Sequence, residues 1–255
     1  MMLQAIQWAA AGTGFTFLMT TLGAALVFFF AGEPRPRFQR TMLGFAAGVM
    51  TAASVWSLLI PAIDQASAES ALPGWLPAAG GMLLGVVFLA ALDALLPRLR
   101  RRREEMTAGW KQTTLLVTAI TLHNVPEGMA VGLAFALAAA GDGVAGAAAL
   151  ALGIGIQNFP EGAAIALPLR QNGWSRKKSF LGGALSGVVE PVFGVLVVLA
   201  AAGIRPLMPW LLSFAAGAML YVVVEELIPQ AHSRAGTCGF VLGFLIMMVL
   251  DVALG

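Results

Sequence analysis

Apolar residues occur along the chain in long runs that are separated by short polar stretches. Each run is about 20 residues long, which is the length that an α-helix needs to cross the hydrocarbon core of a bilayer. The pattern predicts an all-α membrane protein that forms a single transmembrane domain over residues 1–255. The eight predicted helices lie near residues 5–31, 41–63, 76–97, 112–139, 144–168, 179–203, 207–230 and 236–254.

The composition agrees with this pattern. Of the 255 residues, 59% are hydrophobic and only 11% are charged, and the mean hydropathy is +0.85. These values exclude an ordinary soluble globular domain. The single cysteine, Cys238, excludes an internal disulfide and a CxxC metal site. The first apolar run lacks the basic start and the cleavage site of a signal peptide, so we expect it to remain as a helix.

Basic residues lie almost entirely in every second loop. If the N-terminus is external, the internal loops hold every lysine and arginine except Arg205, whereas Asp64, Glu69 and Asp142 fall in the opposite loops. Because positive residues are retained on the cytoplasmic side, we expect both termini to be external. The arginine run at 100–103 has no interleaved aromatic residues, which favours a membrane anchor over a nucleic-acid site.

A short motif occurs on two consecutive predicted helices, as HNVPEG at 123–128 and as QNFPEG at 157–162. Pro126 and Pro160 each remove one backbone donor and crowd the carbonyl four residues earlier, so we expect a kink in each helix. Carbonyls freed in this way are tolerated in a bilayer where they line a cavity or find a partner. The sixth predicted helix adds Glu190, which is also followed directly by a proline.

The polar residues of these three helices share one depth in the membrane. At a rise of about 1.5 Å per residue, the first residue of each motif and Glu190 lie roughly 16–18 Å from the internal ends of their helices, near the midplane. Residues three and four apart also share one face of a helix. The sequence therefore predicts a midplane cluster of His123, Asn124, Glu127, Gln157, Asn158, Glu161 and Glu190.

The carboxylates of this cluster need a counter-charge. A charged residue at the centre of a bilayer costs on the order of 3 kcal/mol, and every lysine and arginine maps to a loop. Metal ions or bound protons must therefore neutralise them, although the amides taken singly could equally serve only to join helices by hydrogen bonds. One imidazole with several oxygens and no thiolate suits Zn²⁺, Fe²⁺ or Mn²⁺, with Cd²⁺ as a mimic. A Mg²⁺ or Ca²⁺ cage would not need His123.

The two PEG motifs and the Glu-Pro pair on the sixth helix resemble those of the ZIP (Zrt-, Irt-like) family of metal transporters, in particular its bacterial GufA-type members. The resemblance covers the whole chain and implies a ZIP-type bundle with a two-metal site. It also implies that Glu161 and Glu190 bridge the two metals. The implied ligands are His123, Glu127, Gln157, Glu161 and Glu190 for the first metal, and Asn124, Asn158, Glu161 and Glu190 for the second.

The resemblance implies further residues along a transport path. Met50 matches a family position that faces the first metal, and its thioether is a suitable ligand, although a methionine on an apolar helix fills space at least as often. Asp64 matches an external entrance carboxylate, and an ordinary solvated acid is an equal alternative. The implied release path toward the cytoplasm consists of Asp93, Glu225, Glu226 and His232.

Two positions depart from the family pattern. Many members have an acid or a histidine where this chain has Asn158 and Glu225, which leaves the occupancy of the second metal open. The link at 97–112 is rich in arginine and has no histidine, so we do not expect it to sense cytoplasmic metal.

Together these features predict a transporter, not an enzyme, that moves Zn²⁺ or another divalent transition metal into the cytoplasm, and the resemblance to the ZIP family implies alternating access. The chain has no GxxxxGK[ST] motif for ATP. The main alternative is a metal-dependent intramembrane hydrolase, but the HExxH arrangement is absent. A metal-free, proton-linked carrier of an organic solute would need cationic or aromatic contacts at the midplane, and the chain has one tyrosine and no lysine or arginine there.

The remaining expectations concern location and partners. We expect a multi-pass protein of a bacterial inner membrane, with no nucleic-acid partner and no cofactor apart from the metal that it carries as substrate. Because crowded carboxylates repel one another, metal binding should displace protons. The resemblance also implies a homodimer.

Overall fold

The computed structural model is a bundle of helices. It describes residues 2–29, 36–69, 73–101, 108–171, 173–203 and 205–254, and over these residues it contains no β-strand. In this part of the chain, eight stretches of helix are long and apolar enough to cross a membrane. The all-α fold with eight spans that the sequence predicts is therefore confirmed.

Several spans consist of more than one helical segment in series. The first four spans contain α1 (Met2–Ala25) with η1 (Leu26–Phe28), then α2 (Pro36–Ala53) with η2 (Ser54–Leu59) and α3 (Ile60–Glu69), then α4 (Trp75–Arg101), and then α5 (Ala108–Leu137) with η3 (Ala138–Asp142). The last four spans contain α6 (Val144–Gln171), then α7 (Arg176–Ser186) with α8 (Val189–Gly203), then η4 (Arg205–Leu207) with α9 (Met208–Val222), η5 (Val223–Leu227) and α10 (Ile228–Ala231), and then α11 (Arg234–Leu254).

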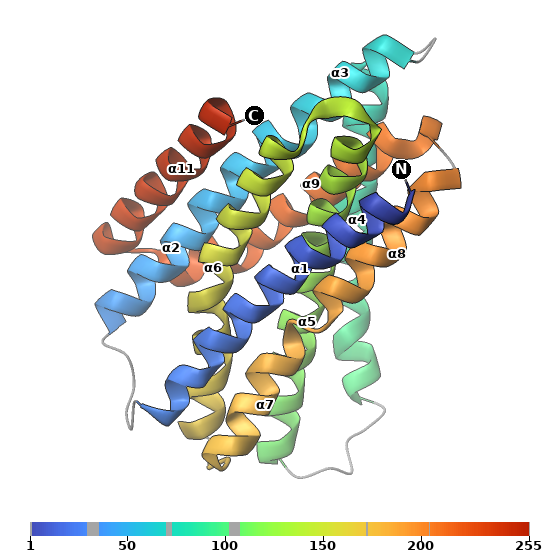
Figure 1. Cartoon of the computed structure of the whole chain (residues 1–255). Coiled ribbons are helices and arrows are strands. Elements are labelled where there is room, and N and C mark those ends of the chain that lie inside the picture. Colours follow the sequence, from blue (N-terminus) through green and yellow to red (C-terminus); the bar gives the residue numbers. More distant parts are fainter. Residues whose placement is uncertain are drawn as a thin grey trace.

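The helices α2 and α11 lie side by side and run parallel (Figure 1). Glycines allow their backbones to approach closely, because a Cβ atom added to Gly44 would overlap the backbone of Gly236 and one added to Gly48 would overlap the carbonyl of Phe240. Lipid supplies no hydrophobic drive between helices, so this pair depends on close van der Waals packing.

A second group of helices forms around α1. This helix packs against both α6 and α8, and α5 packs against α8 (Figure 1). Elsewhere α4 packs mainly against α9. The two helices that carry the PEG motifs, α5 and α6, therefore meet α8 and α1 in one part of the bundle.

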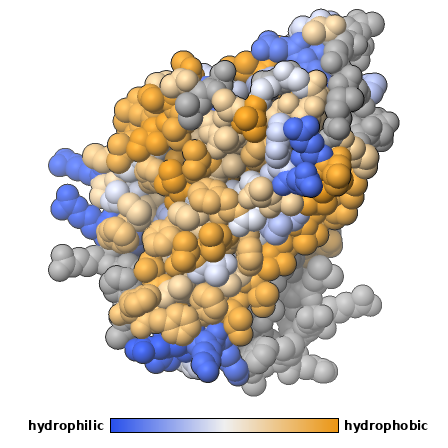
Figure 2. Space-filling model, viewed as in Figure 1, coloured by the Kyte–Doolittle hydropathy of each residue, from blue (hydrophilic) through white to orange (hydrophobic). Residues whose placement is uncertain are grey.

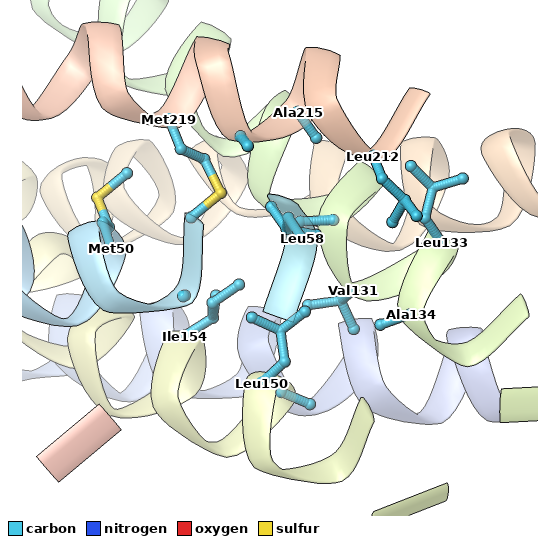
Figure 3. Packing of buried hydrophobic residues seen from close by; sticks show 14 of the residues in the cluster. Met50, Leu58, Val131, Leu133, Ala134, Leu150, Ile154, Leu212, Ala215 and Met219 are labelled. Atoms are coloured by element: carbon cyan, nitrogen blue, oxygen red, sulfur yellow. The ribbon is translucent and has the colours of Figure 1, made fainter. Parts of the chain in front are cut away.

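One apolar core lies where α2, η2, α5, α6 and α9 meet (Figure 3). It contains Met50 and Leu58 from the second span, Val131 from α5, Ile154 from α6 and Met219 from α9, all of which are buried. These side chains pack the five helical segments against one another without adding charged groups.

The outer surface is apolar over most of the face seen in Figure 2, and hydrophilic residues gather toward its ends. Large exposed apolar side chains lie on α4, for example Leu83 and Val87, and on α11, for example Leu245 and Val249. Lipid covers such side chains in a membrane protein, whereas water would leave them as a large apolar patch. Both ends of the chain lie toward the same end of the bundle (Figure 1).

Three boundaries differ from those expected from hydropathy. The sequence places Asp64 in a loop after the second helix, but it lies inside α3, where its side chain is exposed. The link expected at 97–112 is shorter, since α4 continues to Arg101 and α5 begins at Ala108. Hydropathy indicates where the lipid ends. A helix can continue past that point, because many polar residues that face water still have good helix propensity. The sixth span is also broken, between α7 and α8.

Candidate metal site

The hairpin of α5 and α6 brings the two PEG motifs onto neighbouring antiparallel helices. Two glycines make this turn possible, because Gly141 has a φ of 131° and Gly143 has a φ of 82°. Residues that have a Cβ atom rarely adopt such φ angles. The described helices continue without interruption through Pro126 and Pro160. The two motifs therefore face each other from continuous helices.

Glu190 lies at the break in the sixth span. Helix α7 ends at Ser186, and Glu190 is in the first turn of α8, where its N–H donates to the carbonyl of Gly187 at 3.0 Å. The next residue, Pro191, also lies in the first turn of α8, where the backbone N–H that proline lacks would have no partner within the helix. A carboxylate at the N-terminus of a helix is also favoured by the helix dipole.

Two amide side chains hold two of the carboxylates across helix interfaces. Nε2 of Gln157 on α6 donates to Oε1 of Glu127 on α5 at 3.0 Å. Nδ2 of Asn158 donates to Oε2 of Glu190 on α8 at 2.9 Å. All four side chains are buried. The three helices α5, α6 and α8 therefore meet at these four side chains, and their depth in the membrane stays a prediction.

A third amide points its donor away from the carboxylates. Nδ2 of Asn124 on α5 donates to the carbonyl of Ser186 at the end of α7, at 3.0 Å. Each amide thus donates an N–H to a protein acceptor, whereas its oxygen has no hydrogen-bond partner. Buried oxygens in this cluster with no hydrogen-bond partner are Asn124 Oδ1, Glu127 Oε2, Gln157 Oε1 and Asn158 Oδ1.

Glu161 lies near both other carboxylates. It is partly buried on α6 and interacts electrostatically with Glu127 and with Glu190. The described lysine and arginine side chains, by contrast, are all exposed. They are Arg37, Arg40, Arg170, Arg176, Lys177, Lys178 and Arg234. Within the described part of the chain, no lysine or arginine is buried beside these three carboxylates.

Three expected residues add less to this picture. The backbones of His123 and Asp93 lie in α5 and α4, but their side chains are outside the described residues. Met50 is buried in the apolar core. Among the described side chains, no three histidine, cysteine, aspartate or glutamate residues lie close enough together to hold a metal ion. Any cation bound here would need the amide oxygens as well as the carboxylates.

The expected path residues lie toward opposite ends of the bundle. His232 directly follows α10 and lies two residues before α11. The start of α11 packs beside the start of α2, whereas Asp64 lies in α3 beyond the far end of α2. Glu225 and His232 are exposed, and Glu226 is partly buried. His232 and Asp64 therefore lie toward opposite ends of the bundle.

Sequence reasoning missed polar partners that surround the cluster. Thr20 on α1 donates to Oε1 of Glu190 at 3.3 Å. Elsewhere Ser57 in η2 donates to Oδ1 of the buried Asp251 on α11 at 2.5 Å. A signal for Thr20 does exist in the sequence, because threonines at positions 13, 16 and 20 repeat at helical spacing on one face of an apolar helix.

The fold and this cluster define a polytopic membrane protein with an acidic site between its helices, and no described lysine or arginine side chain lies in that site. The family described as ZIP Zinc transporter matches residues 103–251. The chain is 35% identical to the zinc transporter ZIP11 of Homo sapiens over 97% of both chains. It is 38% identical to the zinc transporter GufA of Myxococcus xanthus, over 92% of this chain and 94% of that one. The chain belongs to the ZIP family.

The family resemblance seen in the motifs is therefore confirmed. A third relative, the zinc transporter ZIPB of Bordetella bronchiseptica, is 37% identical over 98% of this chain and 82% of its own length. Members of this family are transporters, so the protein is a multi-pass membrane transporter of metal cations and not an enzyme. The alternative of an intramembrane hydrolase is not favoured.

Proposed function

We propose that this protein carries divalent transition-metal cations, Zn²⁺ foremost, across the membrane and into the cytoplasm through the cluster formed by α5, α6 and α8. Transport proceeds without ATP. The relatives named above are called zinc transporters, which supports Zn²⁺ as the first substrate to test.

One observation carries this proposal. Among the described side chains of the cluster, the buried atoms without a partner are all oxygens, and each of the three amides directs its N–H₂ toward a carboxylate or a carbonyl. Turning Gln157 over would set its oxygen against a carboxylate oxygen of Glu127, which electrostatics opposes. Buried polar atoms are rarely left unpaired in proteins. A cation is the partner that several oxygens at one place can share.

The candidate ligands follow from these atoms and from the family motifs. The free oxygens of Glu127 and Gln157, together with Glu161 and Glu190, suit a first cation, and the imidazole of His123 would complete it. The oxygens of Asn124 and Asn158 suit a second cation, with Glu161 and Glu190 shared between the two. Met50 remains a candidate for the first cation only, through its thioether.

The ligand types limit the choice of cation. Three carboxylates can offset most of the charge of two divalent ions. A set of oxygens with one imidazole and no thiolate favours borderline ions such as Zn²⁺, Fe²⁺ and Mn²⁺. Because two of the second-site ligands are neutral amides, we propose that the second ion binds more weakly than the first.

Protons would balance the site when metal is absent. Three neighbouring carboxylates repel one another in a medium of low dielectric constant, so bound protons relieve that repulsion and an arriving cation displaces them. The cation reaches the site from the side of Asp64 and leaves toward Glu225, Glu226 and His232. We propose that transport occurs by alternating access, in which the first, fourth, fifth and sixth spans move as a unit against the other four spans. We also propose that the protein is a homodimer and that both termini are external.

Liposomes test this function directly. The purified protein in liposomes should admit Zn²⁺ or Cd²⁺ down a gradient without ATP, and flux should fall strongly in Glu190→Ala. Empty liposomes and liposomes with the variant are the controls. If folded wild-type protein gave the same flux as empty liposomes for every divalent first-row ion, the proposed function would be rejected.

A further inference from the structure

The first helix contributes a row of buried hydroxyl groups to the interior of the bundle. Thr13, Thr16 and Thr20 are spaced three and four residues apart on α1, and all three side chains are at most 1% exposed. The hydroxyl of Thr13 donates to the carbonyl of Ala9 at 2.6 Å, and that of Thr16 donates to the carbonyl of Thr13 at 3.0 Å. The single hydroxyl proton of Thr20 has two acceptors within reach, the carbonyl of Thr16 at 3.2 Å and Oε1 of Glu190 at 3.3 Å. The bonds within α1 do not explain why the row faces α8, and the side chains of both Thr16 and Thr20 also interact with the carboxylate of Glu190 on α8.

Thr20 also reaches the cluster. Its Oγ1 lies 3.3 Å from Oε1 of Glu190, whereas Oε2 of the same carboxylate accepts from Asn158 at 2.9 Å. The two oxygens of Glu190 are therefore held by donors from two different helices, α1 and α6. A carboxylate held at both oxygens has its plane fixed, and each oxygen keeps a lone pair for a cation.

Close packing fixes Thr20 itself. A Cβ atom added to Gly162 on α6 would overlap the carbonyl oxygen of Thr20, so the two backbones touch at this point. On the other side, a Cβ added to Gly187 would lie 3.1 Å from Cβ of Thr20 and 3.2 Å from Oε1 of Glu190. Gly162 directly follows Glu161, so Thr20 is wedged between the segments that carry the two carboxylates proposed to bridge the metals.

We propose that Thr20 is a positioning residue of the transport site, which orients the carboxylate of Glu190 for cation binding from a helix that supplies no ligand. This inference rests on the proposed function for the role of Glu190. It predicts that the effect of Thr20 on the metal depends on its hydroxyl group and not on its volume.

Three variants separate the hydroxyl from the packing. Thr20→Val keeps the shape and removes the donor, and we expect Zn²⁺ affinity to fall about 10–100-fold, as it does when a residue that orients a metal ligand is lost. Thr20→Ser keeps the donor and should bind within a few-fold of wild type. Thr13→Val is the matched control, because Thr13 is equally buried on the same helix and its hydroxyl bonds to Ala9.

The measurements are calorimetric Zn²⁺ titration and the thermal midpoint of each purified variant in detergent. Selective loss of affinity in Thr20→Val, with rescue by Thr20→Ser, supports the proposal. Unchanged affinity in Thr20→Val overturns it. Equal losses in all three variants also overturn it, because they would indicate a purely structural effect.

A metal-free readout separates this inference from the proposed function. The infrared carboxyl band that disappears in Glu190→Gln reports on Glu190 whether or not metal binds. We expect that band to shift in Thr20→Val and to stay in place in Thr13→Val. If wild type bound no metal while the band still shifted, the proposed function would fail and the positioning contact would stand. An unmoved band in Thr20→Val would reject the contact.

Discussion

The substitution Gln157→Leu decides whether this amide binds a cation or only joins two helices. Gln157 is fully buried, its Nε2 donates to Glu127 at 3.0 Å, and its Oε1 has no partner. Leucine is of similar size and removes both atoms. Without metal, the loss of a hydrogen bond to a charged group should cost about 1.5–3 kcal/mol. Part of this cost is offset, because leucine no longer leaves an amide oxygen unpaired.

The response to Zn²⁺ distinguishes the two roles. A ligand that binds only the folded state stabilises it by about 2.7 kcal/mol when its free concentration is 100 times its Kd. If the loss of one oxygen ligand weakens binding about tenfold, the same Zn²⁺ concentration stabilises the variant by only about 1.4 kcal/mol. The stabilisation by Zn²⁺ should therefore be halved in Gln157→Leu, whatever its stability without metal.

Unfolding in mild detergent, with and without Zn²⁺, measures this difference. Ser213→Ala is the control, because Ser213 on α9 is also buried with an unpaired oxygen, but its Cβ faces Gly81 on α4. Its stabilisation by Zn²⁺ should equal that of wild type. If Gln157→Leu also kept the full stabilisation, its amide would be a link between helices, and the reasoning from free oxygens would be refuted.

Three further predictions concern the shared carboxylates and their surroundings. Glu161→Ala and Glu190→Ala should lower metal stoichiometry and affinity more than Asn158→Ala, because a shared ligand serves two cations; equal calorimetric values in the three variants would contradict this. Zn²⁺ added to weakly buffered protein between about pH 7.5 and about pH 5.5 should release protons, and Glu190→Gln should release fewer per metal; wild type that binds Zn²⁺ without proton release would exclude displacement. Gly187→Ala sets a Cβ 3.2 Å from Oε1 of Glu190 and should weaken Zn²⁺ binding several-fold, whereas Gly14→Ala, with no neighbour within 4 Å, should not; equal affinities would show that the site tolerates the added methyl group.

Hydropathy alone predicts the eight spans. The thickness of the bilayer sets the length of an apolar helix that crosses it, and irregular backbone exposed to lipid would leave its hydrogen-bonding groups unpaired. It fails where the helix and the lipid end at different residues. Asp64 shows this, since it lies outside the expected span but still inside α3. The break before Glu190 is marked in the sequence by Pro191, but a proline can equally sit inside a continuous helix, as Pro126 does in α5.

The composition of the site is also readable from the sequence, whereas its contacts are not. The repeat places Glu127 and Gln157 at one depth, but only the packed helices show that these two side chains bond to each other and that Asn158 bonds to Glu190. The spacing of Thr13, Thr16 and Thr20 marks a polar face on α1, but it does not show which helix that face meets. Contacts between helices in lipid depend on close packing of small residues such as Gly162, which no periodicity along a single helix reveals.

The mixture of amides and carboxylates answers a difficulty that any transporter of this design must solve. A site made only of carboxylates would hold a cation tightly, but it would repel itself once the cation had left. Here Gln157 and Asn158 donate to Glu127 and Glu190, so the carboxylates keep hydrogen-bond partners in the absence of metal. The oxygens of the same two amides have no hydrogen-bond partner, and in the proposed function they bind the cation. Each amide thus stabilises the empty site with its nitrogen and can bind the cargo with its oxygen, and replacing either by a carboxylate should favour the loaded state at the expense of release.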